Sequence, residues 1–266
     1  MGTGREIRAS GFIDQGDGRS VILQASHGLM LGPSEGEETG EALRSAAKAG
    51  VDGIIVARGL ADRDSGVIRG RNSPAMLVSL DWTNAFRGKE HPLPMARLEH
   101  LVISSAEEAL ALGASGVTSY FFIGHEDDER EARNMEALSA ICRECDDLEV
   151  PILVQAIPVG ERVTAENYAD SLALASRMAV EAGADMLAIP YAGKGGFGRV
   201  VEASRVPVLL LDLELKMSRG QPEYDFELEA PEALRAGCSG LLLGRRYLKG
   251  EKAADIERMV KLVHGG

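Results

Sequence analysis

The chain has 266 residues, of which 45% are hydrophobic and 26% are charged, a composition typical of an ordinary globular protein. Its formal net charge of −12 argues against nucleic acid and against an anionic membrane surface as partners. No apolar run approaches the roughly 18 residues of a membrane span, and the N-terminus lacks the apolar core of a signal peptide. We therefore expect a cytoplasmic protein that binds neither nucleic acid nor membrane.

Eight short apolar segments recur along the chain, with helical patterns between them. The expected strands are Ser20–Ala25, Asp52–Ala57, Ala75–Leu80, Gly116–Ile123, Pro151–Ile157, Asp185–Ile189, Pro207–Asp212 and Gly240–Gly244. The expected helices are Glu41–Ala49, Asp62–Arg71, Ser105–Leu112, Glu126–Cys145, Glu166–Glu181, Gly198–Ala203, Pro231–Ala236 and Ala253–Val263. This alternation predicts parallel strands joined by crossover helices.

A short repeat supports the count of eight βα units. A glycine at positions 50, 113, 183 and 237 ends a helix, a polar turn follows, and an apolar strand begins. The repeat marks every second strand, which favours a (β/α)8 barrel over an open doubly wound sheet. Barrels of about 250 residues are commonly single domains. We predict one TIM-barrel domain over residues 1–266, with a short N-terminal arm at about 1–19.

Cations gather near the ends of the last three expected strands, in a chain of negative net charge. They are Lys194, Lys216, Arg219, Arg245 and Arg246. Gly195 and its neighbouring glycines flank Lys194 at a helix start, where free backbone N–H groups and the helix dipole favour an anion. The loops after strands seven and eight are also a frequent phosphate site in TIM barrels. We expect a phosphorylated or otherwise anionic small-molecule substrate at this rim.

Other titratable residues lie at expected strand ends. His27 ends the first strand, where it is either a general acid/base or a hydrogen-bonded structural residue. His125 and Glu126 open a long helix, whose acidic first turn favours a capping role over metal ligation. Asp81 and Glu161 are candidate carboxylates, although no paired spacing singles them out. The cysteines Cys142 and Cys145 are spaced as CxxC inside this helix, and without a second pair they favour reduced thiols over a zinc site.

The chain resembles the DeoC/LacD class I aldolases over nearly its whole length. The resemblance rests on GDGRS followed by a strand and His-Gly, on YFFIGHEDDEREARNMEALSAICRECDDLEVPILVQAIPVGE, on GADMLAIPYAG, and on AGCSGLLLGRRYLKGE with VHG near the C-terminus. It implies a barrel, a Schiff-base lysine on strand six, and a phosphate held by loops after strands seven and eight. Many members assemble into rings, so we expect a homo-oligomer.

The chain departs from the family at the catalytic positions. The resemblance places the family's lysine at Ala188, its strand-one aspartate at Ser26 and its strand-five tyrosine at Ile157. The family's paired glycines after strand seven correspond to Asp212-Leu213-Glu214. The positions that match are His27, Tyr191, Gly193, Gly244 and Arg245. These belong to the scaffold and the implied phosphate-binding site, and not to the catalytic centre.

The first hypothesis is an aldolase-like carbon–carbon lyase or synthase with relocated catalytic residues. An amine nucleophile needs a lowered pKa, which desolvation or a neighbouring cation can supply. Lys216, which lies near Arg219 and Arg245 at the expected rim, is the expected nucleophile, with His27 as the proton shuttle. Lys194 fits phosphate binding better. This chemistry needs no cofactor.

Two alternatives stay open. An isomerase or metal-assisted lyase could use strand-end carboxylates as acid/base groups or as ligands of a divalent metal. The candidates are Asp81, Glu161, Asp212 and Glu214. A non-catalytic homologue that binds sugar phosphates would keep the cationic rim without the catalytic groups.

Overall fold

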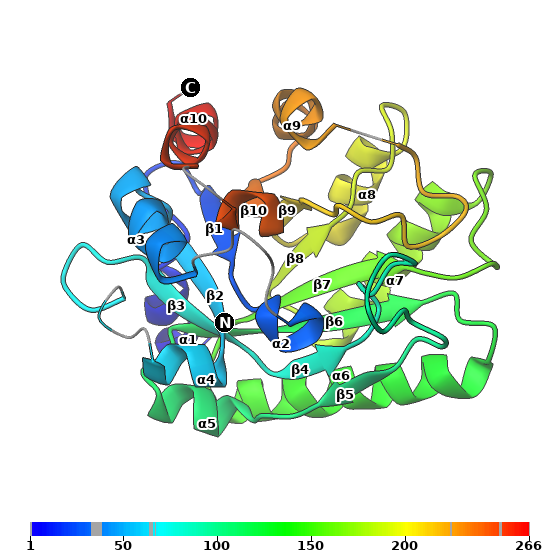
Figure 1. Cartoon of the computed structure of the whole chain (residues 1–266), viewed down its shortest axis with the longest axis horizontal. Helices are drawn as coiled ribbons and strands as arrows, with labels where there is room; N and C mark the ends of the chain where they lie inside the picture. Colours follow the sequence, from blue (N-terminus) through cyan, green and yellow to red (C-terminus); the bar gives the residue numbers. More distant parts are fainter. Residues whose placement is uncertain are drawn as a thin grey trace.

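The computed structural model describes residues 2–32, 39–63, 66, 68–223, 225–249 and 252–265. Eight parallel strands close into a barrel in the order β1-β10-β9-β8-β7-β6-β3-β2. Helices surround these strands (Figure 1), which confirms the predicted TIM barrel. In the described part of the chain, no helix combines the length and apolar character needed to cross a membrane.

All eight predicted strands are present, and each strand end lies within one residue of the expected position. They are β1 (Ser20–Gln24), β2 (Gly53–Ala57), β3 (Ala75–Ser79), β6 (Gly116–Ile123), β7 (Ile152–Pro158), β8 (Met186–Ile189), β9 (Val208–Leu211) and β10 (Gly240–Leu243). A further antiparallel pair, β4 (Asp81–Thr83) and β5 (His100–Val102), forms a separate two-stranded sheet after β3.

The described residues form ten α-helices, most of which cover the outside of the barrel (Figure 1). They are α1 (Thr3–Ala9), α2 (Gly28–Leu31), α3 (Thr39–Ala49), α4 (Arg58–Arg63), α5 (Ala106–Ala111), α6 (Asp128–Leu148), α7 (Tyr168–Ala182), α8 (Phe197–Ser204), α9 (Phe226–Arg235) and α10 (Ala253–His264). A 3-10 helix, Arg245–Leu248, follows β10.

Local chemistry explains where these helices begin and end. The repeated glycines at positions 50, 113, 183 and 237 all have positive φ angles, which end α3, α5, α7 and α9. Ser105 and Glu108 form a reciprocal capping box at the start of α5. Asp127 accepts a hydrogen bond from the backbone N–H of Glu129 and caps α6, as the acidic helix start predicted.

Strand residues alternate between two apolar layers. In β1, Val21 and Leu23 pack outward against the helices, whereas Ile22 belongs to the cluster that fills the barrel interior. Ala188 and Ile157 are interior residues with no exposed surface, so the positions that the family resemblance singles out do face the barrel axis.

The N-terminal arm closes one end of the barrel. Phe12, just after α1, joins the interior cluster and lies against the first residues of β2 and β6, where Gly53 and Gly116 leave room for its ring. Arg5 on α1 forms ion pairs with Asp146 at 2.7 Å and Asp185 at 3.1 Å. With the amino ends of the strands covered, the carboxyl ends form the open end of the barrel.

One predicted helix is misplaced. The helix expected at Asp62–Arg71 is instead α4 at Arg58–Arg63, and residues 68–71 form bends and turns. Residues 64, 65 and 67 of the expected helix lie outside the described residues. Glycines at positions 66 and 70 disfavour the helix beyond Arg63.

Candidate active site

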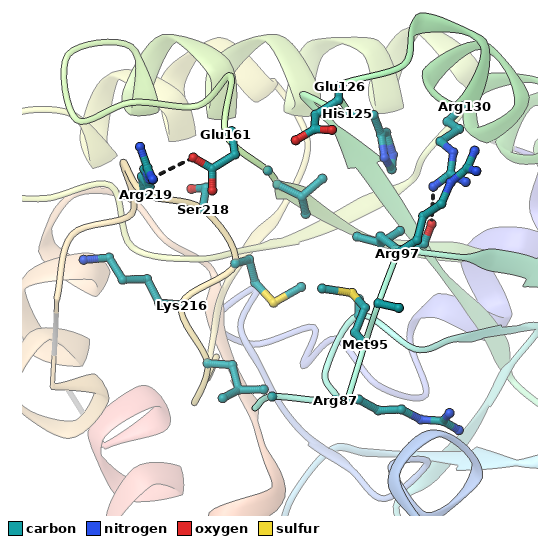
Figure 2. Close-up of a pocket in the computed structure, with 18 of the residues that line it drawn as sticks. Arg87, Met95, Arg97, His125, Glu126, Arg130, Glu161, Lys216, Ser218 and Arg219 are labelled. Atoms are coloured by element: carbon teal, nitrogen blue, oxygen red, sulfur yellow. Dashed lines mark hydrogen bonds and ion pairs between the residues drawn. The ribbon is translucent and has the colours of Figure 1, made fainter. Parts of the chain in front are cut away.

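A cavity of about 960 Å³ opens at the carboxyl ends of the strands. Its walls come from residues within 85–98, 125–130, 159–161 and 215–219 (Figure 2). The last three segments follow β6, β7 and β9, and the first lies between β4 and β5. A backbone bridge between Gly160 and Ser218 ties the segments after β7 and β9 together. The cavity therefore occupies the position at which TIM barrels build their active sites.

Cationic side chains dominate the charge of the cavity wall. Five cations line it, namely Arg87, Arg97, Arg130, Lys216 and Arg219, and Figure 2 labels them all. The carboxylates that line it are Glu126, Asp127 and Glu161. In a chain with a net charge of −12, an excess of positive charge in one cavity favours an anionic ligand.

Some of these cations are held by neighbours in fixed positions. Arg130 donates to the Leu98 carbonyl at 2.7 Å and pairs with Glu99 at 2.9 Å. Arg87 donates to the Met30 carbonyl at 2.9 Å, and its guanidinium lies 5.4 Å from the centre of the Trp82 ring. These contacts fix the guanidinium groups before any ligand binds.

Two of the five cavity cations, Arg219 and Lys216, were predicted from the sequence, and both are largely exposed to solvent. Arg219 pairs with Glu161 at 2.8 Å, and its side chain is 78% exposed. The Lys216 side chain is 49% exposed, and its Nζ lies 3.9 Å from Glu223 Oε1. The structure thus brings Lys216, Arg219 and Glu161 to one cavity, with the Glu223 carboxylate as a neighbour of the Lys216 amine.

Some buried polar atoms of the cavity wall lack hydrogen-bond partners. Of the buried side-chain atoms in the described residues that lack such a partner, three belong to lining residues: His125 Nε2, Arg130 Nε and Ser218 Oγ. A buried polar atom left unpaired costs about 1–3 kcal/mol. Ligand groups that bond these atoms would remove this penalty, so the cavity is a candidate binding site.

His125 is the most buried titratable group of the cavity wall. The residue is 6% exposed, and burial lowers the pKa of its imidazole. The carboxylates of Glu131 and Asp127 oppose this shift, whereas His100 adds to it. The sequence placed His125 at a helix start; the structure places it before the Asp127 cap, on the cavity wall.

His27 lies outside the cavity lining. It precedes α2, is 9% exposed, and its ring packs edge-on against Phe86 with the centroids 6.4 Å apart. Burial, and then the charge of Arg245, lower its pKa to about 4. The imidazole is therefore neutral at neutral pH. Its assignment as proton shuttle stays a prediction.

The implied phosphate-binding site after strands seven and eight already holds a carboxylate of the protein itself. Asp212 Oδ2 accepts a hydrogen bond from the Gly244 backbone N–H at 3.2 Å, and Asp212 Oδ1 pairs with Arg246 at 2.8 Å. A side chain on Gly244 would meet the Asp212 carbonyl oxygen at 2.7 Å. This close approach explains why glycine stands at position 244.

The remaining predicted rim residues also have partners elsewhere. The Tyr191 hydroxyl donates to Glu232 at 2.9 Å, and its ring packs on Phe197 with the centroids 5.3 Å apart. Lys194 is 77% exposed and lies 3.6 Å from the same Glu232 carboxylate. The predicted phosphate-binding residues Tyr191, Lys194, Gly195, Gly244 and Arg245 do not line the cavity.

The four candidate carboxylates do not converge on one metal site. Asp81 is fully buried, and its carboxylate accepts hydrogen bonds from His100 Nε2 at 2.7 Å, Ser119 Oγ at 2.7 Å and the Tyr120 N–H at 2.6 Å. This network joins β4, β5 and β6 and holds the cavity wall in shape.

One group of potential metal ligands occurs in the described residues, and it lies away from the cavity. It consists of Asp14, Asp17 and His264. His264 Nδ1 bonds Asp17 at 2.8 Å and Nε2 bonds Asp52 at 3.0 Å. Asp17 and Asp52 precede β1 and β2, so this cluster sits at the opposite end of the barrel.

The barrel interior contains no amine. All seven lysines of the chain are described, and none of them is buried. Position 188, where the resemblance places the family's Schiff-base lysine, is a buried alanine. Lys216 is the one lysine that lines the cavity.

The family model for DeoC/LacD family aldolases matches residues 20–250. The chain belongs to the DeoC/LacD aldolase family. It is 32% identical to the class 1 fructose-bisphosphate aldolase of Thermoproteus tenax, over 94% of this chain and 91% of that protein. It is 29% identical to 2-amino-3,7-dideoxy-D-threo-hept-6-ulosonate synthase 1 of Archaeoglobus fulgidus, over 94% of this chain and 87% of that protein.

A solved archaeal fructose-1,6-bisphosphate aldolase has the same architecture. It superposes with a TM-score of 0.78 at 26% identity and covers 98% of this chain and 99% of that one. In that structure the catalytic lysine is covalently bound to the carbinolamine intermediate of the substrate. Membership of the family confirms the prediction of an aldolase-type enzyme.

Sequence reasoning missed most of the cavity wall. Arg87 and Arg97 lie in the long connection between β4 and β5, where no strand-end pattern drew attention to them. A signal was available: such a long connection inside a compact domain often carries function. Arg130 lies in the first turn of α6, among acidic residues that suggested only helix capping.

Proposed function

We propose that this chain is an aldolase-type carbon–carbon lyase or synthase that acts on a phosphorylated or otherwise anionic carbonyl compound in the cavity. The observation that carries the proposal is the convergence of five cations and of unpaired buried polar atoms at the carboxyl ends of the barrel strands. The named relatives act on fructose bisphosphate or make an aminodideoxyheptulosonate, which is consistent with a sugar-like carbonyl substrate.

In this proposal the arginines bind the anionic group and Lys216 is the nucleophile. Its amine attacks the substrate carbonyl, and loss of water leaves an iminium ion that accepts the electron pair of the breaking carbon–carbon bond. The Lys216 side chain is half exposed, so the substrate itself has to bury the amine. No metal or cofactor takes part.

Borohydride trapping tests the nucleophile directly. The protein is incubated with dihydroxyacetone phosphate or pyruvate, reduced with borohydride, and analysed by intact and peptide mass spectrometry. We expect an adduct on Lys216 that is absent from Lys216→Arg and present in the matched variant Lys194→Arg. An adduct on Lys194 alone, or on no lysine, would contradict the assignment.

Binding without turnover would indicate the non-catalytic alternative. In that case sugar phosphates raise the unfolding temperature but no carbon–carbon bond is made or broken. The homo-oligomer stays a prediction, which light scattering of the purified protein would check.

A further inference from the structure

We propose that His125 is the catalytic acid/base of this cavity, which takes up the substrate's hydroxyl proton at its Nε2 atom and returns it to the substrate carbon. The inference rests on the proposed function, because it assigns a residue to the same site. His125 was not among the residues that the family resemblance marks as catalytic.

Geometry aims one nitrogen of His125 at the ligand. The imidazole interacts with the Phe122 carbonyl, and Nε2 is buried without a partner, so Nδ1 is the nitrogen that faces Phe122. A neutral imidazole that donates its Nδ1 hydrogen keeps a lone pair on Nε2. Figure 2 shows the ring pointing from the end of β6 toward the cavity. His125 lines the cavity, so the free atom is a buried base at the cavity wall.

The backbone around His125 is held from several sides. Gly124 has a φ of 87°, and its N–H donates to Glu131 at 2.9 Å. A side chain at Gly124 would meet the Val159 carbonyl oxygen at 2.7 Å. The His125 carbonyl accepts from Arg162 at 2.9 Å. Such a fixed backbone keeps the imidazole in one place, which proton transfer requires.

The surroundings favour the neutral form. Burial lowers the His125 pKa, and His100 on β5 acts in the same direction, whereas Glu131 and Asp127 on α6 act against it. Arg97 and Arg130 also line the cavity and disfavour a second positive charge, while Glu126 has the opposite effect. A base with a pKa below the ordinary value of about 6.5 is unprotonated at neutral pH.

The chemical step balances with the residues present. In the cleavage direction, Nε2 accepts the proton of the hydroxyl on the carbon β to the carbonyl. The O–H electron pair forms the new carbonyl, the Cα–Cβ bond breaks, and its electron pair moves to the iminium nitrogen on Lys216. The imidazolium then returns its proton to Cα of the resulting enamine, and water releases the second product.

His27 is the competing candidate, and its position separates it from this role. Both histidines are buried and neutral at neutral pH, but His125 lines the cavity and His27 does not. A variant of each residue therefore distinguishes contact with the substrate from burial alone.

The kinetic test measures exchange of the α-hydrogens of dihydroxyacetone phosphate with deuterated water, together with cleavage of fructose 1,6-bisphosphate. We expect His125→Gln to lose about 100-fold or more in kcat with little change in KM. His27→Gln should lose less activity than His125→Gln, and the control His264→Gln, at the opposite end of the barrel, should retain most of its activity. Added imidazole should partly restore His125→Ala, which a purely structural role would not allow. Full activity in His125→Gln, or loss without imidazole rescue, would overturn the proposal.

A second measurement does not depend on turnover. Dihydroxyacetone phosphate is titrated into protein carrying ¹⁵N-labelled histidine, and His125→Gln assigns the resonances. We expect the His125 Nε2 signal to shift and the His264 signals to stay. A wild-type protein whose Nε2 signal shifts without turnover or adduct would refute the proposed function alone. An Nε2 chemical shift that stays unchanged when the ligand binds would refute the role of His125.

Discussion

The buried carboxylate of Asp212 should make the stability of the protein depend on pH near neutrality. The side chain has no exposed surface, and burial raises its pKa to about 7, against the ordinary value of 3.8. Glu214 adds to the shift, whereas Arg246 and the Gly244 N–H oppose it. The folded state therefore holds a proton on Asp212 that the unfolded chain has lost.

The sign and size of the effect follow from proton linkage. A folded pKa above the unfolded one gives stability that is complete at low pH and is lost as pH rises through about 7. Each pKa difference of one corresponds to about 1.4 kcal/mol, so the full effect is about 4 kcal/mol. Between pH 5.5 and 8.5 we expect a loss of about 2 kcal/mol.

Asp212→Asn isolates this contribution, since asparagine keeps the shape and the acceptor for the Gly244 N–H but does not titrate in this range. Urea unfolding at pH 5.5 and 8.5 measures the free energy of unfolding of both proteins. His27 has a pKa lowered to about 4, so it decreases the stability of both proteins as the pH falls below 6.5. The informative quantity is therefore the difference in the free energy of unfolding between the wild type and Asp212→Asn. Equal pH dependence in the two proteins would refute the reasoning.

Three further predictions concern the site. Arg219→Gln should weaken binding of inorganic phosphate about tenfold, measured by calorimetry, because a charge-assisted hydrogen bond is lost. The control Arg177→Gln on α7 should leave the affinity unchanged. Equal affinities of Arg219→Gln and the wild type would exclude Arg219 from anion binding. Gly244→Ala should lower the free energy of unfolding by about 1–3 kcal/mol, because the new Cβ would lie 2.7 Å from the Asp212 carbonyl oxygen. In the control Gly59→Ala the new Cβ meets nothing within 4 Å, so this variant should not destabilise the protein. Dialysis against EDTA should leave activity unchanged, and a loss restored by a divalent cation would favour the metal-assisted alternative.

Strand positions could be predicted because burial on both faces makes each strand a continuous apolar run. The glycines at positions 50, 113, 183 and 237 showed the spacing of the βα units, and each has the positive φ that only glycine adopts easily. The β4–β5 pair was missed because three-residue strands are too short for a periodic signal. Its anchor, the Asp81–His100 pair, joins residues that lie far apart in the sequence.

The candidate site was less predictable, because its shape depends on which loops touch. Lys216, Arg219 and Glu161 were identified from their positions after strands, and they do meet in one cavity. His27 lies at a strand end too, yet the α2 turn that follows leaves it outside the cavity lining. A strand-end position thus brings a residue to the correct end of the barrel without deciding whether it reaches the ligand.

Two places at the carboxyl ends of the strands could bind an anion: the loops after β9 and β10, and the cavity over β6, β7 and β9. At the loops after β9 and β10, a phosphate would have to displace the Asp212 carboxylate from Arg246 and from the Gly244 N–H. Above about pH 7, where Asp212 is ionised, that exchange replaces one anion by another, so the net gain in free energy is small. Buried side-chain atoms without hydrogen-bond partners occur at both places, namely Arg246 Nε after β10, and His125 Nε2 and Ser218 Oγ in the cavity. Five cations line the cavity, so we propose that the anion binds over β6, β7 and β9, displaced from the site that the family resemblance implies.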